Sequence, residues 1–324
     1  MIISRTPLRI SLGGGGTDLP SFYENNGGGF LVAAAITKYI YVSVHENFTD
    51  SFFLKYSKYE DVQDLNDVQH PLIREALKQV GTTRFLEISS QADIPAGTGL
   101  GSSGTFAVGL LNALYASNHK FTSSEELAKL ACHLEIDVLG EPVGKQDQYI
   151  AAIGGLTTLE FAPSGEVQIR SIAMDPLKRK DLEERLMLFY TGIRRSASSE
   201  LAALDEGASV KDSGMQQNLN EVREIGHLSA KILESGDLDE FGKLLTQQWD
   251  LKFSRSPSPT HSDVDKWIQL GISHGAVGGK LVGAGGGGFL LFLADNKNAL
   301  RSKMAEIGLK EVDFGFDYRG SIIQ

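Results

Sequence analysis

Glycine and serine dominate the stretch DIPAGTGLGSSGTFAVG, residues 93–109. Within it, Gly99, Gly101 and Gly104 match the pattern G-x-G-x-x-G, which is typical of dinucleotide binding. That interpretation requires the glycines at the first strand–helix turn of a βαβ unit, with an acidic residue about 20 positions later at the end of the next strand. The acidic residues at that distance fall at the start of an expected helix instead, so the context argues against a dinucleotide.

A Walker-type loop, G-x-x-x-x-G-K-[ST], fits no better. Counted from Gly97, Ser102 and Ser103 stand where that motif needs glycine and lysine. The physical features of an anion site remain, because small residues let backbone N–H groups approach an anion and a following helix directs its positive end at it. A serine hydroxyl can also ligate Mg²⁺, which prefers oxygen. The alternative is a tight turn without a ligand, but the run of small residues exceeds what a turn needs.

Three segments resemble the motifs of one superfamily, the galactokinase, homoserine kinase, mevalonate kinase and phosphomevalonate kinase (GHMP) group. PAGTGLGSSG, residues 95–104, resembles the ATP-loop motif P-x-x-x-G-L-G-S-S, and PLRISLGGGGTDLPSF, residues 7–22, resembles the N-terminal substrate motif. KLVGAGGGGF, residues 280–289, resembles the C-terminal glycine motif. The resemblance implies a two-domain α+β fold: a domain like the second domain of ribosomal protein S5 at 1–165, and a ferredoxin-like domain at 166–324.

The resemblance further implies phosphoryl transfer from ATP with Mg²⁺ as a second cofactor. The residues expected to hold ATP are Pro95, Gly97, Gly99, Leu100, Gly101, Ser102, Ser103 and Gly104. Ser103 is expected to be a Mg²⁺ ligand, with Ser102 as the alternative. The family takes a second ligand from a glutamate in the next helix, which fits Glu135, with Glu141 as its competitor.

The segment GKQDQYIAAIGG resembles the part of the family in which an aspartate opens a helix. Asp147 is therefore expected to be the catalytic base that orients the acceptor hydroxyl and takes its proton late in the transfer. Arg9 matches a position that is Arg or Lys in the N-terminal motif. It is expected to face Asp147 and to stabilise charge on the transferred phosphoryl group.

Residues of the first and last motifs are expected to bind the acceptor. Asp18 matches the family's sugar-hydroxyl ligand, and a carboxylate suits vicinal hydroxyls because it accepts two hydrogen bonds. Gly15, Gly16 and Thr17 would line the same pocket. In the C-terminal motif, Gly285 and Gly286 are assigned to the substrate, while Lys280 is expected to support the phosphate loop.

The Gly-Gly-Gly-Thr-Asp variant with VGKQDQ is similar to the D-glycero-D-manno-heptose 7-phosphate kinase branch, with fucose kinase domains as relatives. Such an enzyme phosphorylates the anomeric hydroxyl and gives a 1,7-bisphosphate for nucleotide-heptose synthesis. Basic residues must then hold the 7-phosphate, and the candidates on expected loops are Arg194, Arg195, Lys252 and Arg255. The alternatives are an unphosphorylated sugar such as fucose, galactose or heptose as acceptor, and a non-catalytic sugar- and nucleotide-binding relative.

Composition limits the partners. The 324 residues carry a formal net charge of -10, which argues against nucleic acid or an acidic membrane surface as the main partner. The single cysteine, Cys132, excludes a disulfide within the chain and fits a reducing compartment. No signal peptide or membrane-spanning run is evident. We expect a cytoplasmic monomer or homodimer that binds a small-molecule sugar phosphate.

The elements that position these residues follow from hydrophobic patterning. The first half reads as short strands (LRISL, FLVAAAI, YIYVSVH, FFLKYS, FLEISS) followed by a helix over FAVGLLNALYAS. A second helix should begin near TSSEEL, where Thr122 and Ser123 each precede a glutamate by three residues. The second half reads as strands at GEVQIRSIAM and RLMLFYTG and two helices over 215–253. A Ser/Pro loop, another helix and a glycine loop entering a strand follow.

Overall fold

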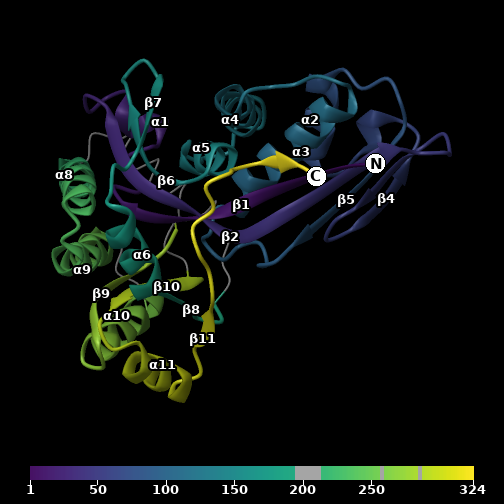
Figure 1. The fold of residues 1–324 in the computed structure, drawn as a ribbon. Helices are drawn as coiled ribbons and strands as arrows, with labels where there is room; N and C mark the ends of the chain where they lie inside the picture. The colour runs from purple at the N-terminus through teal and green to yellow at the C-terminus, as the bar shows by residue number, and fades with distance from the viewer. Residues whose placement is uncertain (194–212, 256–258, 284–286) are drawn as a thin grey trace.

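The computed structural model describes residues 1–193, 213–255, 259–283 and 287–324. In this part of the chain, two sheets organise the molecule (Figure 1). The first has the strand order β12-β1-β2-β5-β3-β4, with β6 beside β2 and β7 beside β6, and the second has the order β11-β8-β10-β9. The expected two-domain α+β fold is confirmed.

Two long antiparallel strands, β1 (Ile2–Gly13) and β2 (Gly29–Glu46), form the middle of the first sheet. The first half of β2, GFLVAAAI, is buried at every position, whereas the second half alternates between buried and partly exposed residues. A strand covered on both faces reads as a continuous apolar run, and one with a solvated face alternates. Helices α3, α5 and α8 pack against β2 and account for that continuous burial.

The helices of the first half gather beside this sheet (Figure 1). They are α2 (Pro71–Val80), α3 (Ser102–Ser117), α4 (Ser124–Cys132), a π-helical turn (His133–Val138) and α5 (Gln146–Ile153). The expected N-cap of α4 is present, because Ser123 Oγ accepts from Glu126 N at 3.2 Å. The remaining elements are α1 (Pro20–Tyr23), β3 (Phe52–Lys55), β4 (Tyr59–Val62), β5 (Leu86–Ala92), β6 (Leu156–Phe161) and β7 (Val167–Ser171).

The second half contains the four-stranded sheet and has a hydrophobic cluster of its own around Trp249 and Phe292. Its strands are β8 (Leu186–Tyr190), β9 (Ala276–Leu281), β10 (Phe289–Ala294) and β11 (Lys310–Val312). Its helices are α6 (Pro176–Arg185), α8 (Ser213–Ser235), α9 (Leu238–Arg255), α10 (Pro259–Ile272) and α11 (Lys297–Glu306). The two helices expected over 215–253 are α8 and α9.

The change from one sheet to the other comes later than residue 165. Residue 165 lies in the turn between β6 and β7, and β7 still pairs with β6 in the first sheet. The second sheet begins only at Leu186. The C-terminal segment then returns to the first sheet, where β12 (Ile322–Ile323) pairs with β1. The boundary predicted at residue 165 therefore falls inside the β6–β7 hairpin. Sequence composition does not show strand pairing across a turn, so the sequence could not reveal this.

Candidate active site

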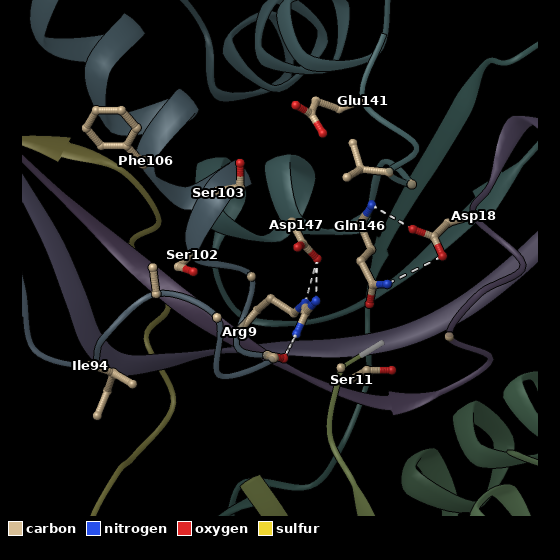
Figure 2. Close-up of a pocket in the computed structure, with 18 of the residues that line it drawn as sticks. Arg9, Ser11, Asp18, Ile94, Ser102, Ser103, Phe106, Glu141, Gln146 and Asp147 are labelled. Atoms are coloured by element: carbon tan, nitrogen blue, oxygen red, sulfur yellow. Dashed lines mark hydrogen bonds and ion pairs between the residues drawn. The ribbon is translucent and has the colours of Figure 1, made fainter. Parts of the chain in front are cut away.

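A cavity of about 660 Å³ lies where the two halves meet. Its wall takes residues from β1, the loop before α3, the start of α5, and α9 and β9 of the second half. Figure 2 shows one apolar end near Ile94 and Phe106, an Arg9–Asp147 pair in the middle, and Asp18 with Gln146 at the other side. The cavity therefore joins the three sequence motifs that pointed to phosphoryl transfer.

The glycine–serine loop opens helix α3 and directs the N-terminus of that helix toward the cavity. Gly101, the N-cap, has a φ of 78°, and the first helical hydrogen bond runs from Thr105 N to Gly101 O at 3.0 Å. The N–H groups of residues 102–104 consequently have no partner within the helix. Free N–H groups at the positive end of a sixteen-residue helix can bind phosphate oxygens.

The C-terminal glycine motif packs directly on this loop. Gly99 and Gly283 both have positive φ values, 82° and 80°, and a Cβ on Gly283 would lie 2.5 Å from Gly99 Cα. Only glycine allows this backbone approach. The contact joins the two halves at the expected phosphate loop. Gly285 and Gly286 lie outside the described residues, and so do Arg194 and Arg195.

Arg9 and Asp147 form a partly buried ion pair in the middle of the cavity. Arg9 donates from Nε to Asp147 Oδ1 at 2.7 Å, and its NH2 lies 2.6 Å from the same oxygen. Its NH1 donates to the carbonyl of Gly99 at 2.7 Å, which ties the pair to the glycine loop (Figure 2). β1 and the first turn of α5 position the two side chains. The structure thus places together the two residues expected to be catalytic.

Ser103 and Glu135 meet at the N-terminus of α3. Ser103 Oγ donates to Glu135 Oε1 at 2.5 Å, and Gln148 Nε2 donates to Glu135 Oε2 at 2.6 Å. Glu135 lies in the π-helical turn and is 1% exposed. Burial raises the pKa of its carboxyl to about 7, while the two hydrogen bonds act in the opposite direction. Glu141, the competitor, also lines the cavity but makes no contact with Ser103 among the described hydrogen bonds.

This pair fits the donor set of a magnesium site. A hydroxyl and a carboxylate offer oxygen atoms beside a loop that can hold phosphates. No lysine or arginine in the described ranges forms an ion pair with Glu135, so its charge has no cationic side chain to balance it. A divalent cation would supply that balance.

Asp18 is held by backbone and amide donors at the side of the cavity away from Ile94 and Phe106 (Figure 2). Gly16 N donates to its Oδ1 at 3.1 Å and Gln146 N to its Oδ2 at 3.2 Å. Burial, and then the charge of Asp147, raise the pKa of the Asp18 carboxyl, whereas these backbone donors lower it. Gly144 permits this position, since a Cβ there would lie 1.9 Å from Asp18 Oδ2.

Thr17 does not line the cavity as expected. The carbonyls of Gly14 and Phe30, 2.8 and 2.9 Å from its hydroxyl oxygen, share its one hydrogen, and the same oxygen accepts from Phe30 N at 3.1 Å. The side chain is fully buried and fastens the glycine loop to β2. Gly15 and Gly16 do lie on the cavity wall. The threonine therefore shapes the loop, because its hydroxyl is already fully used.

Two of the four basic candidates for a remote phosphate lie on the cavity wall, at the C-terminal end of α9. Lys252 Nζ donates to the carbonyl of Gly283, and Arg255 NH1 donates to Asn218 Oδ1 at 3.2 Å. Arg255 forms no ion pair with the described carboxylates, and burial lowers the pKa of its guanidinium to about 10. Both lie on a helix, whereas the sequence favoured a loop.

The apolar end of the cavity was missed in the sequence. Its wall includes Tyr56, His70, Leu72, Ile94 and Phe106. The His70 ring stands edge-on to Tyr56, with centroids 4.7 Å apart, and lies 5.6 Å from the Phe106 ring. These residues come from separate segments of the chain, so no local pattern indicated that they meet.

The fold and the cavity together define a kinase that transfers a phosphoryl group to an alcohol on a small molecule. Two family models match the chain: the GHMP kinases N terminal domain at residues 70–155 and the GHMP kinases C terminal domain at residues 229–308. The chain therefore belongs to the GHMP kinases, which use ATP as the phosphate donor.

Its relatives include sugar kinases. The chain is 29% identical to the D-glycero-alpha-D-manno-heptose 7-phosphate kinase of Campylobacter jejuni, across 98% of this chain and 97% of the relative. It is 30% identical to the galactokinase of Pyrococcus furiosus, across 64% of each chain. Among solved structures, a D-glycero-D-manno-heptose 1-phosphate kinase from Bacteroides thetaiotaomicron has a TM-score of 0.81 at 23% identity, covering 100% of this chain and 99% of that one. Across the described part of the chain, no helix has the length and apolar character needed to cross a bilayer.

Proposed function

We propose that the chain is a Mg²⁺-dependent kinase that transfers the γ-phosphoryl group of ATP to the anomeric hydroxyl of D-glycero-D-manno-heptose 7-phosphate. The observation that carries the substrate is the similarity over the full length of both chains to the Campylobacter heptose 7-phosphate kinase. Arg255 on the cavity wall supports it, because its guanidinium forms no ion pair with a described carboxylate and a sugar phosphate needs a cation remote from the reacting carbon.

In this proposal the adenine lies against the apolar end of the cavity, and the triphosphate follows the loop from Gly97 to Ser103. The free N–H groups at the start of α3 bind phosphate oxygens. The Ser103 hydroxyl and the Glu135 carboxylate would hold Mg²⁺, which neutralises phosphate charge when bound.

The chemical step depends on Asp147 and Arg9. Asp18 and the Gln146 amide hold the sugar hydroxyls, so that the anomeric oxygen faces Asp147 Oδ2. The anomeric oxygen of the sugar forms a bond to the γ-phosphorus while the bond from that phosphorus to the β,γ-bridging oxygen breaks and ADP leaves. Its proton passes to Asp147, and Arg9 stabilises the charge that develops on the transferred group.

The test is an ADP-release assay over heptose 7-phosphate, free heptose, fucose and galactose, with the phosphorylated carbon identified by ³¹P NMR. Turnover of heptose 7-phosphate to a 1,7-bisphosphate is the expected result. One relative is named a heptose 7-phosphate kinase and the other a heptose 1-phosphate kinase, so their names put the substrate's phosphate on different carbons. The carbon that is phosphorylated must therefore be measured directly. Turnover of free sugars without turnover of heptose 7-phosphate contradicts the proposed substrate.

A paired variant tests the remote phosphate site. Arg255→Met should raise KM for heptose 7-phosphate by about tenfold or more, because a charge-assisted contact to phosphate is lost. Activity on any unphosphorylated sugar should be unaffected. Arg301→Met, on the exposed face of α11 and paired with Glu311, is the matched control. An equal effect of Arg255→Met on both kinds of acceptor would remove Arg255 from the phosphate site.

The second candidate is a kinase for an unphosphorylated sugar. The galactokinase relative supports it, and so does a 30% identical bifunctional fucokinase of Arabidopsis thaliana that aligns with 70% of this chain and 21% of that protein. A non-catalytic relative is disfavoured, because Arg9, Ser103, Glu135 and Asp147 are all present and in contact as pairs.

A further inference from the structure

Lys280 is a buried lysine whose side chain lies on the wall of the same cavity. It comes from β9, near the glycine segment that packs on the phosphate loop, and it is 6% exposed. Lysine is almost never buried to this extent unless it is paired. The sequence suggested only that it supports the loop.

The hydrogen-bond partner of Lys280 is neutral. Nζ donates to Gln248 Oε1 at 2.9 Å, and no described carboxylate forms an ion pair with it. The charge that acts on it most is that of Arg9, a second cation. Burial, followed by Arg9, lowers the pKa of the Lys280 ammonium to about 7.

Gln248 is fixed in an orientation that aims the lysine. Its Nε2 donates to Leu12 O at 2.9 Å and to Leu244 O at 3.3 Å, so both amide hydrogens are used by carbonyls of β1 and α9. Its Oε1 must therefore face Lys280. An ammonium has three N–H donors, and Gln248 takes one, so two remain for a ligand.

Of the three carboxylates on the cavity wall, Asp147 pairs with Arg9 and Asp18 accepts from Gly16 and Gln146. Neither these two nor Glu141 forms an ion pair with Lys280 among the described residues. A bound ligand can therefore supply the anion that balances Lys280. Because Gly283 of the same segment contacts Gly99 of the phosphate loop, a phosphoryl oxygen is the anion within reach.

We propose that Lys280 binds a phosphoryl oxygen of a ligand in this cavity and that Gln248 is its positioning residue. The proposal depends on the kinase reaction of the family and not on the identity of the sugar. The oxygen belongs either to the γ-phosphoryl group of ATP or to a phosphate on the acceptor. Binding of probes that carry only one of these groups distinguishes the two sources.

The test compares wild type with Lys280→Met by calorimetric binding of three probes: ADP, a non-hydrolysable ATP analogue and inorganic phosphate. Lys266→Met, an exposed lysine of α10, is the matched control. If the γ-phosphoryl group is the source, the variant loses about 10- to 100-fold in affinity for the ATP analogue and little for ADP. If the acceptor phosphate is the source, the loss falls on inorganic phosphate alone. Unchanged affinity for all three probes, in a variant that circular dichroism shows to be folded, overturns the proposal.

The role of Gln248 is tested by a double-mutant cycle. Gln248→Leu should weaken the same probe, and it should have little further effect once Lys280 is methionine, because it acts through the lysine. Additive losses would mean that Gln248 has only a structural role. If Lys280→Met does not fold, the binding of the three probes is measured with Gln248→Leu, which retains the lysine. The same losses of affinity then support or overturn the proposal. None of these binding measurements uses a heptose. A result that contradicts the role of Lys280 therefore does not bear on the proposed substrate, and the reverse is also true.

Discussion

Two nitrogens of Arg9 share a single oxygen of Asp147: Nε and NH2 lie 2.7 and 2.6 Å from Oδ1. Oδ2 has no hydrogen-bond partner among the described residues. One oxygen thus fixes the carboxylate and the other is left for a ligand. An oriented carboxylate with one free oxygen is what a general base requires.

Asp147→Asn should reduce kcat by about 10²- to 10⁴-fold, because the amide keeps the shape but cannot take a proton. ATP affinity should change little, since in the proposed site the loop and the start of α3 bind the nucleotide phosphates. Steady-state rates and nucleotide titration check both halves. Glu141→Gln, at the same cavity, serves as the control. Near-normal turnover of Asp147→Asn would exclude it as the base.

Removing either proposed Mg²⁺ ligand, Glu135 or Ser103, should weaken the metal-dependent part of nucleotide binding. We expect Glu135→Gln to raise the Mg²⁺ concentration needed for half-maximal ATP binding by about tenfold or more. Affinity for ATP in EDTA should be unchanged, because the N–H groups at the start of α3 remain. Ser103→Ala should act in the same direction. Equal losses with and without metal would indicate damage to the loop instead.

The buried Lys280 should make stability depend on pH. Its pKa is lowered from 10.5 to about 7 in the folded protein, so the unfolded chain binds the extra proton between these values. The penalty is complete below pH 7 and falls as the pH rises toward 10.5. Lys280→Met should therefore gain stability over wild type at pH 6, and this difference should shrink by about 2–3 kcal/mol by pH 9. Urea unfolding at both pH values measures it, and a difference that does not vary with pH would contradict the assignment.

Gly144→Ala should displace Asp18, since the new Cβ would lie 1.9 Å from Asp18 Oδ2. We expect KM for the acceptor to rise by about tenfold or more, as hydrogen bonds to sugar hydroxyls are lost, while ADP affinity is retained. Asp18→Asn should give a similar profile. An acceptor KM that stays normal in both variants would exclude Asp18 from the sugar site.

The sequence alone predicted which residues meet at the central site. The glycine–serine loop, Arg9, Glu135 and Asp147 were identified from their resemblance to family motifs, each of which is a short continuous segment of the chain. The pairs Arg9–Asp147 and Ser103–Glu135 are present in the structure as expected. The α+β fold followed from the same resemblance, and the helices α8 and α9 followed from local patterning, which needs only neighbouring residues.

Tertiary structure decided which residues face the cavity. Thr17 belongs to the same sequence motif as Asp18, yet its hydroxyl is hydrogen-bonded to the carbonyls of Gly14 and Phe30 and does not face the cavity. Tyr56 follows β3 and His70 precedes α2, and they meet at the apolar end with Phe106 of α3 only in the folded chain, where α2 packs against α3. Lys280 and Gln248 are 32 residues apart and become partners through the contact of α9 with β9. Burial and pairing depend on the elements that pack against a residue, and the linear sequence does not contain that information in any local form.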